Sequence, residues 1–215
     1  VRPLRRDRIE ALVLSWFRAA KCWQVAPRTT EERARIEAEA RSEAERVLAE
    51  LRRIELEDFE FKNLVATPLL LTLLCAVALA ERQIPHKRPE FYQRCLEVLL
   101  RRYTQKTSRA APLQEPETLR ILQEVAHGLH EARRRDGLSA EAFAAWSSRR
   151  ADRSGRARMS PAEAAGLLEW LHQHAGVLTK FGHDDYGFSH LTFQEYLSAL
   201  HVAYGGEGPI EALAD

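Results

Sequence analysis

The sequence predicts a mainly α-helical chain, in which a helical bundle is followed by a second domain of three helices and a small β-hairpin. Apolar residues recur at the three- and four-residue spacing of amphipathic helices along most of the chain. Hydrophobic residues make up 45% of the 215 residues, which is enough to bury a sizeable core. Near the C-terminus, two short extended segments flank a polar turn and indicate the hairpin.

The first half of the chain is predicted to be a succession of helices. Residues 5–20 form an amphipathic helix, and residues 31–53 form a charged, solvent-facing helix with a narrow apolar stripe. A buried helix begins at Pro68, because Thr67 can cap it and proline fits the first turn. Its apolar run is well short of the roughly 20 residues that a membrane span needs.

Another helix begins at Pro89, and a polar segment follows it. Residues 104–116 carry two prolines, which indicates a boundary between domains. Beyond this boundary, residues 119–129 have the apolar spacing of a helix, and Ser139 caps a second one.

A third helix of the second half opens with Ser160, Pro161 and Glu163. Serine at the cap, proline at the first position and glutamate three residues after the serine form a capping box. Three helices followed by two strands is the order of a winged-helix module, which we place at residues 113–203. This order predicts a fold and leaves the function open.

The hairpin and the last helix place one histidine at their junction. The extended segments lie on either side of the turn at residues 183–185. We expect Thr192 to cap the final helix, with Glu195 three residues later completing a capping box. His190 would then lie at the mouth of this helix, near its positive end.

Charge and composition argue against several classes of partner. The chain has 32 basic and 31 acidic side chains and a net charge of +1, so no overall field attracts nucleic acid or anionic lipid. A winged helix often reads DNA with its third helix, but residues 161–174 contain two glutamates and no lysine or arginine. We interpret the arginine-rich residues 147–159 as a solvated loop. A DNA-binding regulator and a nucleotide-independent interaction scaffold remain the alternatives.

Cysteines and histidines indicate neither a disulfide framework nor a metal site. The three cysteines are sparse and unpaired in sequence, as in a cytoplasmic protein with reduced, packed thiols. His127 and His130 share a helix face, but no third residue has the spacing of a zinc ligand. The N-terminus lacks both a signal peptide and an initiator methionine, from which we expect a fragment of a longer protein.

Two blocks of the sequence resemble the region that follows the nucleotide-binding core of NACHT proteins. One begins with Asn63-Leu-Val-Ala-Thr-Pro-Leu-Leu and continues to Tyr92. The other is Phe188-Ser-His-Leu-Thr-Phe-Gln-Glu-Tyr-Leu-Ser-Ala199. NACHT proteins belong to the STAND class of signal-transducing NTPases, which includes NOD-like immune receptors and bacterial anti-phage relatives. The order and wide separation of the two blocks make the resemblance specific.

The resemblance implies a nucleotide site and a mechanism. In this family a proline of the first helical domain packs against adenine, and the winged-helix histidine bonds the β-phosphate of ADP. These roles fall to Pro68 and His190. The implied cofactor is ADP or ATP, with Mg²⁺ in the parent protein, and we expect this chain alone to bind neither. Closure over ADP would hold the parent inactive, and release would permit homo-oligomerisation in innate immunity or anti-phage defence.

The resemblance also implies a division of the chain and its partners. We assign residues 1–20 to the end of the nucleotide-binding core or an entry helix, and residues 21–110 to the first helical domain. The winged helix occupies residues 113–203, and residues 204–215 link it to a downstream sensor. The upstream core would be a partner within the same chain, and we expect no membrane partner. No G-x-x-x-x-G-K-[ST] loop is present, so we expect the ATPase activity only in the parent.

Overall fold

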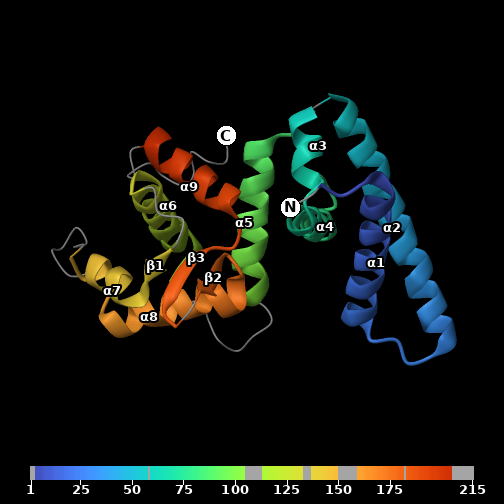
Figure 1. The fold of residues 1–215 in the computed structure, drawn as a ribbon. Helices are drawn as coiled ribbons and strands as arrows, with labels where there is room; N and C mark the ends of the chain where they lie inside the picture. The colour runs from blue at the N-terminus through green and yellow to red at the C-terminus, as the bar shows by residue number, and fades with distance from the viewer. Residues whose placement is uncertain are drawn as a thin grey trace. The chain divides into compact units, whose positions relative to one another are not determined.

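The computed structural model divides the chain into two compact units, residues 1–98 and 99–215, each described here by itself (Figure 1). The structure describes residues 3–57, 59–104, 113–132, 137–149, 159–181 and 183–204. The described part is mainly helical and has one small sheet, so the predicted fold class is confirmed. None of its helices is long and apolar enough to cross a membrane.

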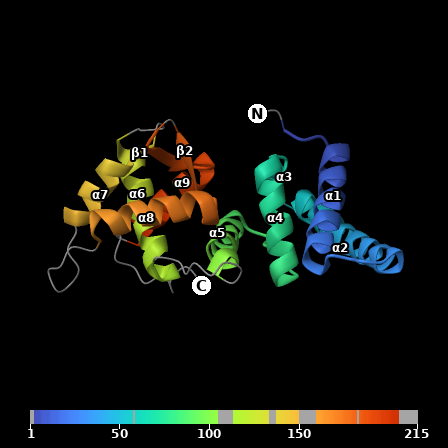
Figure 2. The ribbon, with the colours of Figure 1, turned by 90° about the horizontal axis from the view of Figure 1, so that it is seen from below.

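The first unit is a helical bundle. Its helices are α1 (Arg6–Val25), α2 (Thr30–Glu57), α3 (Phe59–Val65), α4 (Pro68–Glu81) and the first part of α5 (Arg88–Thr104). α1 packs along α2, and α4 packs against both α1 and α3 (Figure 2). The apolar stripe predicted for α2 is buried throughout, at Ile36, Ala40, Val47, Leu48 and Leu51. Helix α3 is an addition to the elements expected from the sequence.

Helix α4 forms the apolar centre of this unit and begins at Pro68, as predicted. Thr67 is the N-cap residue, as predicted, but its side chain accepts no capping hydrogen bond. Backbone bonds hold the turn instead. The Thr67 N–H donates to the Leu64 carbonyl at 3.2 Å, and the Thr67 carbonyl accepts from Leu71 at 2.9 Å.

The second unit contains the predicted three helices and hairpin, together with the end of α5. Its other elements are α6 (Glu115–Glu131), β1 (Leu138–Ser139), α7 (Ala140–Arg149), α8 (Pro161–Trp170), the π-helical turn η1 (Leu171–Ala175), β2 (Leu178–Phe181), β3 (Asp185–Phe188) and α9 (Leu191–Ala203). α6 packs against α9, and α7 packs against α8. The expected boundary at 104–116, arginine-rich loop at 147–159 and linker at 204–215 lie mostly outside the described residues.

The hairpin carries a third strand that the sequence did not predict. The antiparallel sheet has the order β1-β3-β2, in which β1 pairs with β3 through Leu138 and Tyr186. Gly137 precedes β1 with a φ of 90°, and a Cβ atom there would lie 2.3 Å from the Tyr186 carbonyl oxygen. Glycine is therefore required where β1 approaches β3. Ser139 also caps α7 as predicted, because its hydroxyl accepts from the Ala142 N–H at 3.0 Å.

Candidate functional site

His190 lies between the last strand and the last helix, where the sequence placed it. β3 ends at Phe188, and the next N–H, that of Ser189, donates to the Val177 carbonyl at 2.9 Å. This bond carries the pairing of the sheet one residue past β3. His190 keeps an extended backbone, with φ −143° and ψ 133°, and becomes the N-cap residue of α9. The prediction that it lies at the positive end of a helix is confirmed.

The imidazole of His190 itself caps α9. Its Nδ1 atom accepts from the Thr192 N–H at 3.3 Å. The expected capping box of Thr192 and Glu195 is therefore wrong. Because the pairing to Val177 brings the extended chain as far as His190, Thr192 already lies in the first helical turn and supplies a donor.

The cap favours one tautomer of the imidazole. Nδ1 can accept the Thr192 N–H only when it is unprotonated, and the Thr192 hydroxyl, 2.7 Å away, then shares the same lone pair as a second donor. The proton of the neutral ring then lies on Nε2. Within the described residues no group bonds this second nitrogen, which leaves one N–H donor available.

The surroundings of His190 favour the neutral ring. Burial lowers the pKa of His190 from its ordinary value of 6.5, and the nearby Glu195 carboxylate opposes this shift in part. The positive end of α9 disfavours an imidazolium for the same electrostatic reason that it favours an anion. Near neutral pH the site therefore offers an uncharged Nε2–H at a position suited to negative charge.

Pro68, the second predicted site residue, is the first residue of α4 and is half-buried. Its carbonyl accepts from the Thr72 hydroxyl at 2.8 Å, and its neighbour Leu69 remains 38% exposed. The ring and this leucine are apolar groups beside a helix N-terminus. Pro68 belongs to the first unit and His190 to the second.

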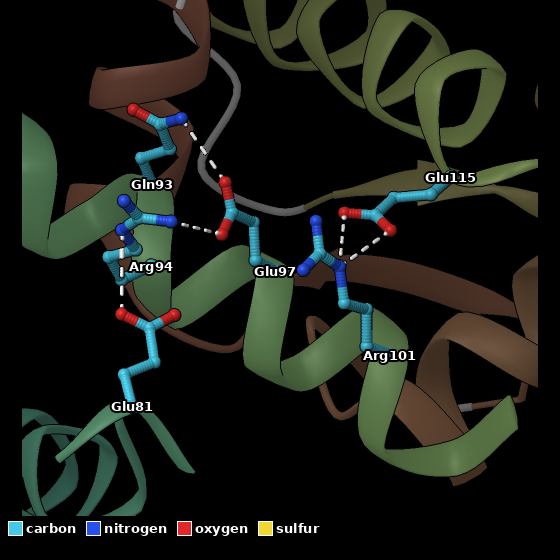
Figure 3. A network of polar contacts seen from close by, with 6 residues as sticks. All are labelled: Glu81, Gln93, Arg94, Glu97, Arg101 and Glu115. Atoms are coloured by element: carbon cyan, nitrogen blue, oxygen red, sulfur yellow. Dashed lines mark hydrogen bonds and ion pairs between the residues drawn. The ribbon is translucent and has the colours of Figure 1, made fainter. Parts of the chain in front are cut away.

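The polar contacts of α5 were not expected from the sequence (Figure 3). In the first unit, Arg94 lies 3.5 Å from a carboxylate oxygen of Glu81 and 3.0 Å from one of Glu97. In the second unit, Arg101 donates from Nε to the carboxylate of Glu115, with a shorter distance of 3.0 Å. Such partly exposed pairs contribute about 0–1 kcal/mol each, so they support the helices without forming a reactive site.

The third helix of the second unit is poorly suited to read DNA. α8 contains no lysine or arginine. Both of its glutamates have structural partners, because Glu163 accepts from the Ser160 N–H at 2.7 Å and Glu169 accepts from the Tyr186 hydroxyl at 2.9 Å. These carboxylates would repel phosphate, so the structure agrees with the sequence in disfavouring this helix as a recognition helix.

One of the two histidines considered as zinc ligands contacts a histidine of another helix. His127 stacks on His201 of α9, with ring centroids 4.5 Å apart. Among the residues that the structure describes, no group of three or more histidine, cysteine, aspartate or glutamate side chains could hold a metal ion.

Comparison with known families identifies the C-terminal part of the chain. Residues 88–202, more than half of the chain, match the family model described as a winged helix-turn-helix domain C-terminal to NACHT. The match begins with the first residue of α5 and ends within the last turn of α9. No curated protein and no solved structure matches the chain.

Proposed function

The chain belongs to the family of winged helix-turn-helix domains C-terminal to NACHT, and on this basis we propose that it is the nucleotide-responsive segment of a NACHT-type STAND ATPase. The winged-helix domain is not itself catalytic. Its role in the parent would be to bind and release a nucleotide held mainly by the upstream NACHT core. The observation that carries the proposal is the His190 imidazole, whose Nδ1 is held by the cap while its Nε2–H is left to donate.

His190 would donate its Nε2–H to the β-phosphate of ADP. A hydrogen bond to a charged group contributes about 1.5–3 kcal/mol. Because about 1.4 kcal/mol shifts an equilibrium tenfold, this single bond is sufficient for a typical allosteric coupling. The cap supports this role because the ring is already oriented by Thr192, so little side-chain freedom is lost on binding.

Pro68 would supply an apolar contact for the adenine ring. Its half-buried ring at the first turn of α4 and the exposed Leu69 beside it are compatible with that contact. Each of the two contacts would be made separately with nucleotide held by the upstream core.

Loss of the His190 contact would release the closed state. In the proposed cycle, ADP holds the winged helix against the NACHT core, and exchange for ATP or a signal from a downstream sensor removes that restraint. Surfaces for homo-oligomerisation would then become available, in a defence response against infection or phage. The segment would act in the cytoplasm as a lid that follows the state of the nucleotide.

Replacement of His190 in the full-length parent tests the proposal. His190→Asn keeps a good helix N-cap but removes the Nε2–H donor, whereas His190→Ala removes both. We expect both variants to retain ADP about tenfold less well and to raise basal signalling, with retention measured by nucleotide analysis of the purified protein. His183→Ala, in an exposed turn with 99% of its side chain accessible, is the matched control.

Unchanged ADP retention and unchanged basal signalling in both His190 variants would reject the nucleotide role. Salt-dependent binding of a DNA duplex by the 215-residue chain would instead support the DNA-binding alternative. Binding of a protein partner that requires neither nucleotide nor His190 would support the scaffold alternative.

A further inference from the structure

A groove lies at the connection between α1 and α2, within the first unit. It has a volume of about 370 Å³ and is lined by Arg18, Cys22, Ala26, Pro27, Arg33 and Glu37. This volume lies in the lower part of the usual range for ligand pockets, roughly 300–1,000 Å³, and suits one side chain better than a whole cofactor. The groove contains none of the residues assigned above to nucleotide binding.

Backbone and capping bonds hold the connection that forms the groove. Ala26 ends α1 in the left-handed region, with φ 49°, and its N–H donates to the Cys22 carbonyl at 2.9 Å. The Thr29 hydroxyl accepts from the Glu32 N–H at 3.1 Å, and the Glu32 carboxylate accepts from the Arg28 N–H at 2.8 Å. The groove is therefore formed before any ligand arrives, which reduces the entropy cost of binding.

Among the described residues, the acidic side chains around the groove leave one arginine without an ion-pair partner. Arg18 pairs with Glu37 across the two helices at 2.6 Å. The Glu32 carboxylate is occupied by the cap of α2, which lowers the pKa of Glu32. The Arg33 side chain makes no ion pair or hydrogen bond with any described residue. The groove therefore favours a ligand with a single negative charge.

The uncharged residues that line the groove are mainly apolar. Ala26, Pro27 and the half-buried Cys22 line the groove. The adjoining residues Trp23 and Val25 are 69% and 58% exposed. Large apolar side chains with this exposure, beside a formed groove, are typical of surfaces that bind another protein.

We propose that this groove binds an acidic peptide segment of a partner protein, in which a carboxylate lies beside an aromatic or large aliphatic side chain. The carboxylate would form a bidentate pair with Arg33, and the apolar side chain would lie against Pro27 and Ala26. A nucleic acid or an anionic membrane fits less well, because the exposed Glu31 and the groove's own Glu37 would repel a field of many negative charges.

The test uses N-acetyl-phenylalanine, which carries a carboxylate next to an aromatic ring, and its uncharged amide as the matched ligand. Amide chemical shifts of the 215-residue chain, followed by NMR during titration, give both dissociation constants. We expect the acid to bind about tenfold more tightly than the amide, and the shifts to concentrate at residues 22–33. Arg33→Ala should abolish the difference, whereas Arg41→Ala, an exposed arginine of α2 outside the groove, should preserve it.

Two results would overturn the proposal. One is equal binding of acid and amide, or a preference that survives Arg33→Ala in a protein with an unchanged thermal unfolding midpoint. The other is co-sedimentation with vesicles of equal parts phosphatidylcholine and phosphatidylserine that is lost in Trp23→Ala, together with no binding of the acid. Neither depends on His190, so this proposal and the proposed nucleotide function can fail independently.

Discussion

The starts of α8 and α9 lie in the same unit, and each satisfies a free backbone N–H of its first turn with a different kind of side chain. At α8, Ser160 accepts from the Glu163 N–H at 3.3 Å while the Glu163 carboxylate accepts from the Ser160 N–H at 2.7 Å. At α9, the imidazole of His190 accepts from the Thr192 N–H at 3.3 Å. Serine, aspartate and asparagine are the usual N-cap residues, and histidine is not among them. A histidine at this position fits the proposed nucleotide role, because capping uses Nδ1 and leaves the Nε2–H free to donate to a ligand.

The largest expected effect on stability is at α8. Ser160→Ala removes the hydroxyl half of a complete capping box, and we expect the free energy of unfolding to fall by about 1–2 kcal/mol. Urea unfolding measures the change. Ser189→Ala is the matched control, because that half-buried side chain has no hydrogen bond to any described residue. An equal loss in both variants would show that the box contributes little.

A smaller effect is expected at α9. His190→Ala should lower the free energy of unfolding by about 1 kcal/mol, and His190→Asn should restore most of it because asparagine is a strong N-cap residue. The same urea experiment compares them. If His190→Asn were as unstable as His190→Ala, the imidazole would stabilise the fold through packing and not through the cap.

The two caps should also respond differently to acid. The folded pKa of His190 is lowered below 6.5, so its contribution is complete above that pH and is lost as the pH falls through the folded pKa. Bonds to Ser160 lower the pKa of Glu163 below 4.5, so the α8 cap persists to more acidic pH. As the pH falls from about 7 to about 5, we expect His190→Asn to become more stable relative to wild type. A pH-independent difference would contradict this.

The smallest effect is expected from Thr192→Val, which removes the hydroxyl that donates to Nδ1. We expect a loss of about 0.5 kcal/mol, the lower end of the range for one hydrogen bond. The more sensitive measurement is the pKa of His190, followed by NMR of its ring protons. That pKa should rise, because the lost donor stabilised the neutral ring. An unchanged pKa would show that the 2.7 Å contact does not determine the protonation of Nδ1.

The two helix starts also show what local sequence can predict. The capping box of α8 was predicted correctly because its determinants lie within four consecutive residues, 160–163. At α9 the same reasoning selected Thr192 and Glu195, which have the same spacing. The choice was decided by the bond from Ser189 to Val177, the residue that precedes β2. A capping motif alone cannot indicate where the preceding strand ends.

The third strand and the groove could not be predicted from local sequence either. The hairpin was predicted from neighbouring residues, but β1 has only two residues, and its pairing with β3 joins Leu138 to Tyr186 far along the chain. Arg33 lies in a charged helix in which every arginine looks alike in sequence. Only the cap around Glu32 and the bridge from Arg18 to Glu37 distinguish it as an arginine of the groove that no described residue pairs with.

The sequence by itself determined the mainly helical fold, the starts of α4 and α8, the NACHT resemblance and the place of His190 between strand and helix. Helix periodicity and capping signals act over one or two turns, so they can be read without the fold. The tertiary structure alone decided that His190 caps α9, that a third strand joins the hairpin and that Arg33 has no ion-pair partner among the described residues. These features depend on burial and on hydrogen bonds between distant segments, which exist only once the chain has folded.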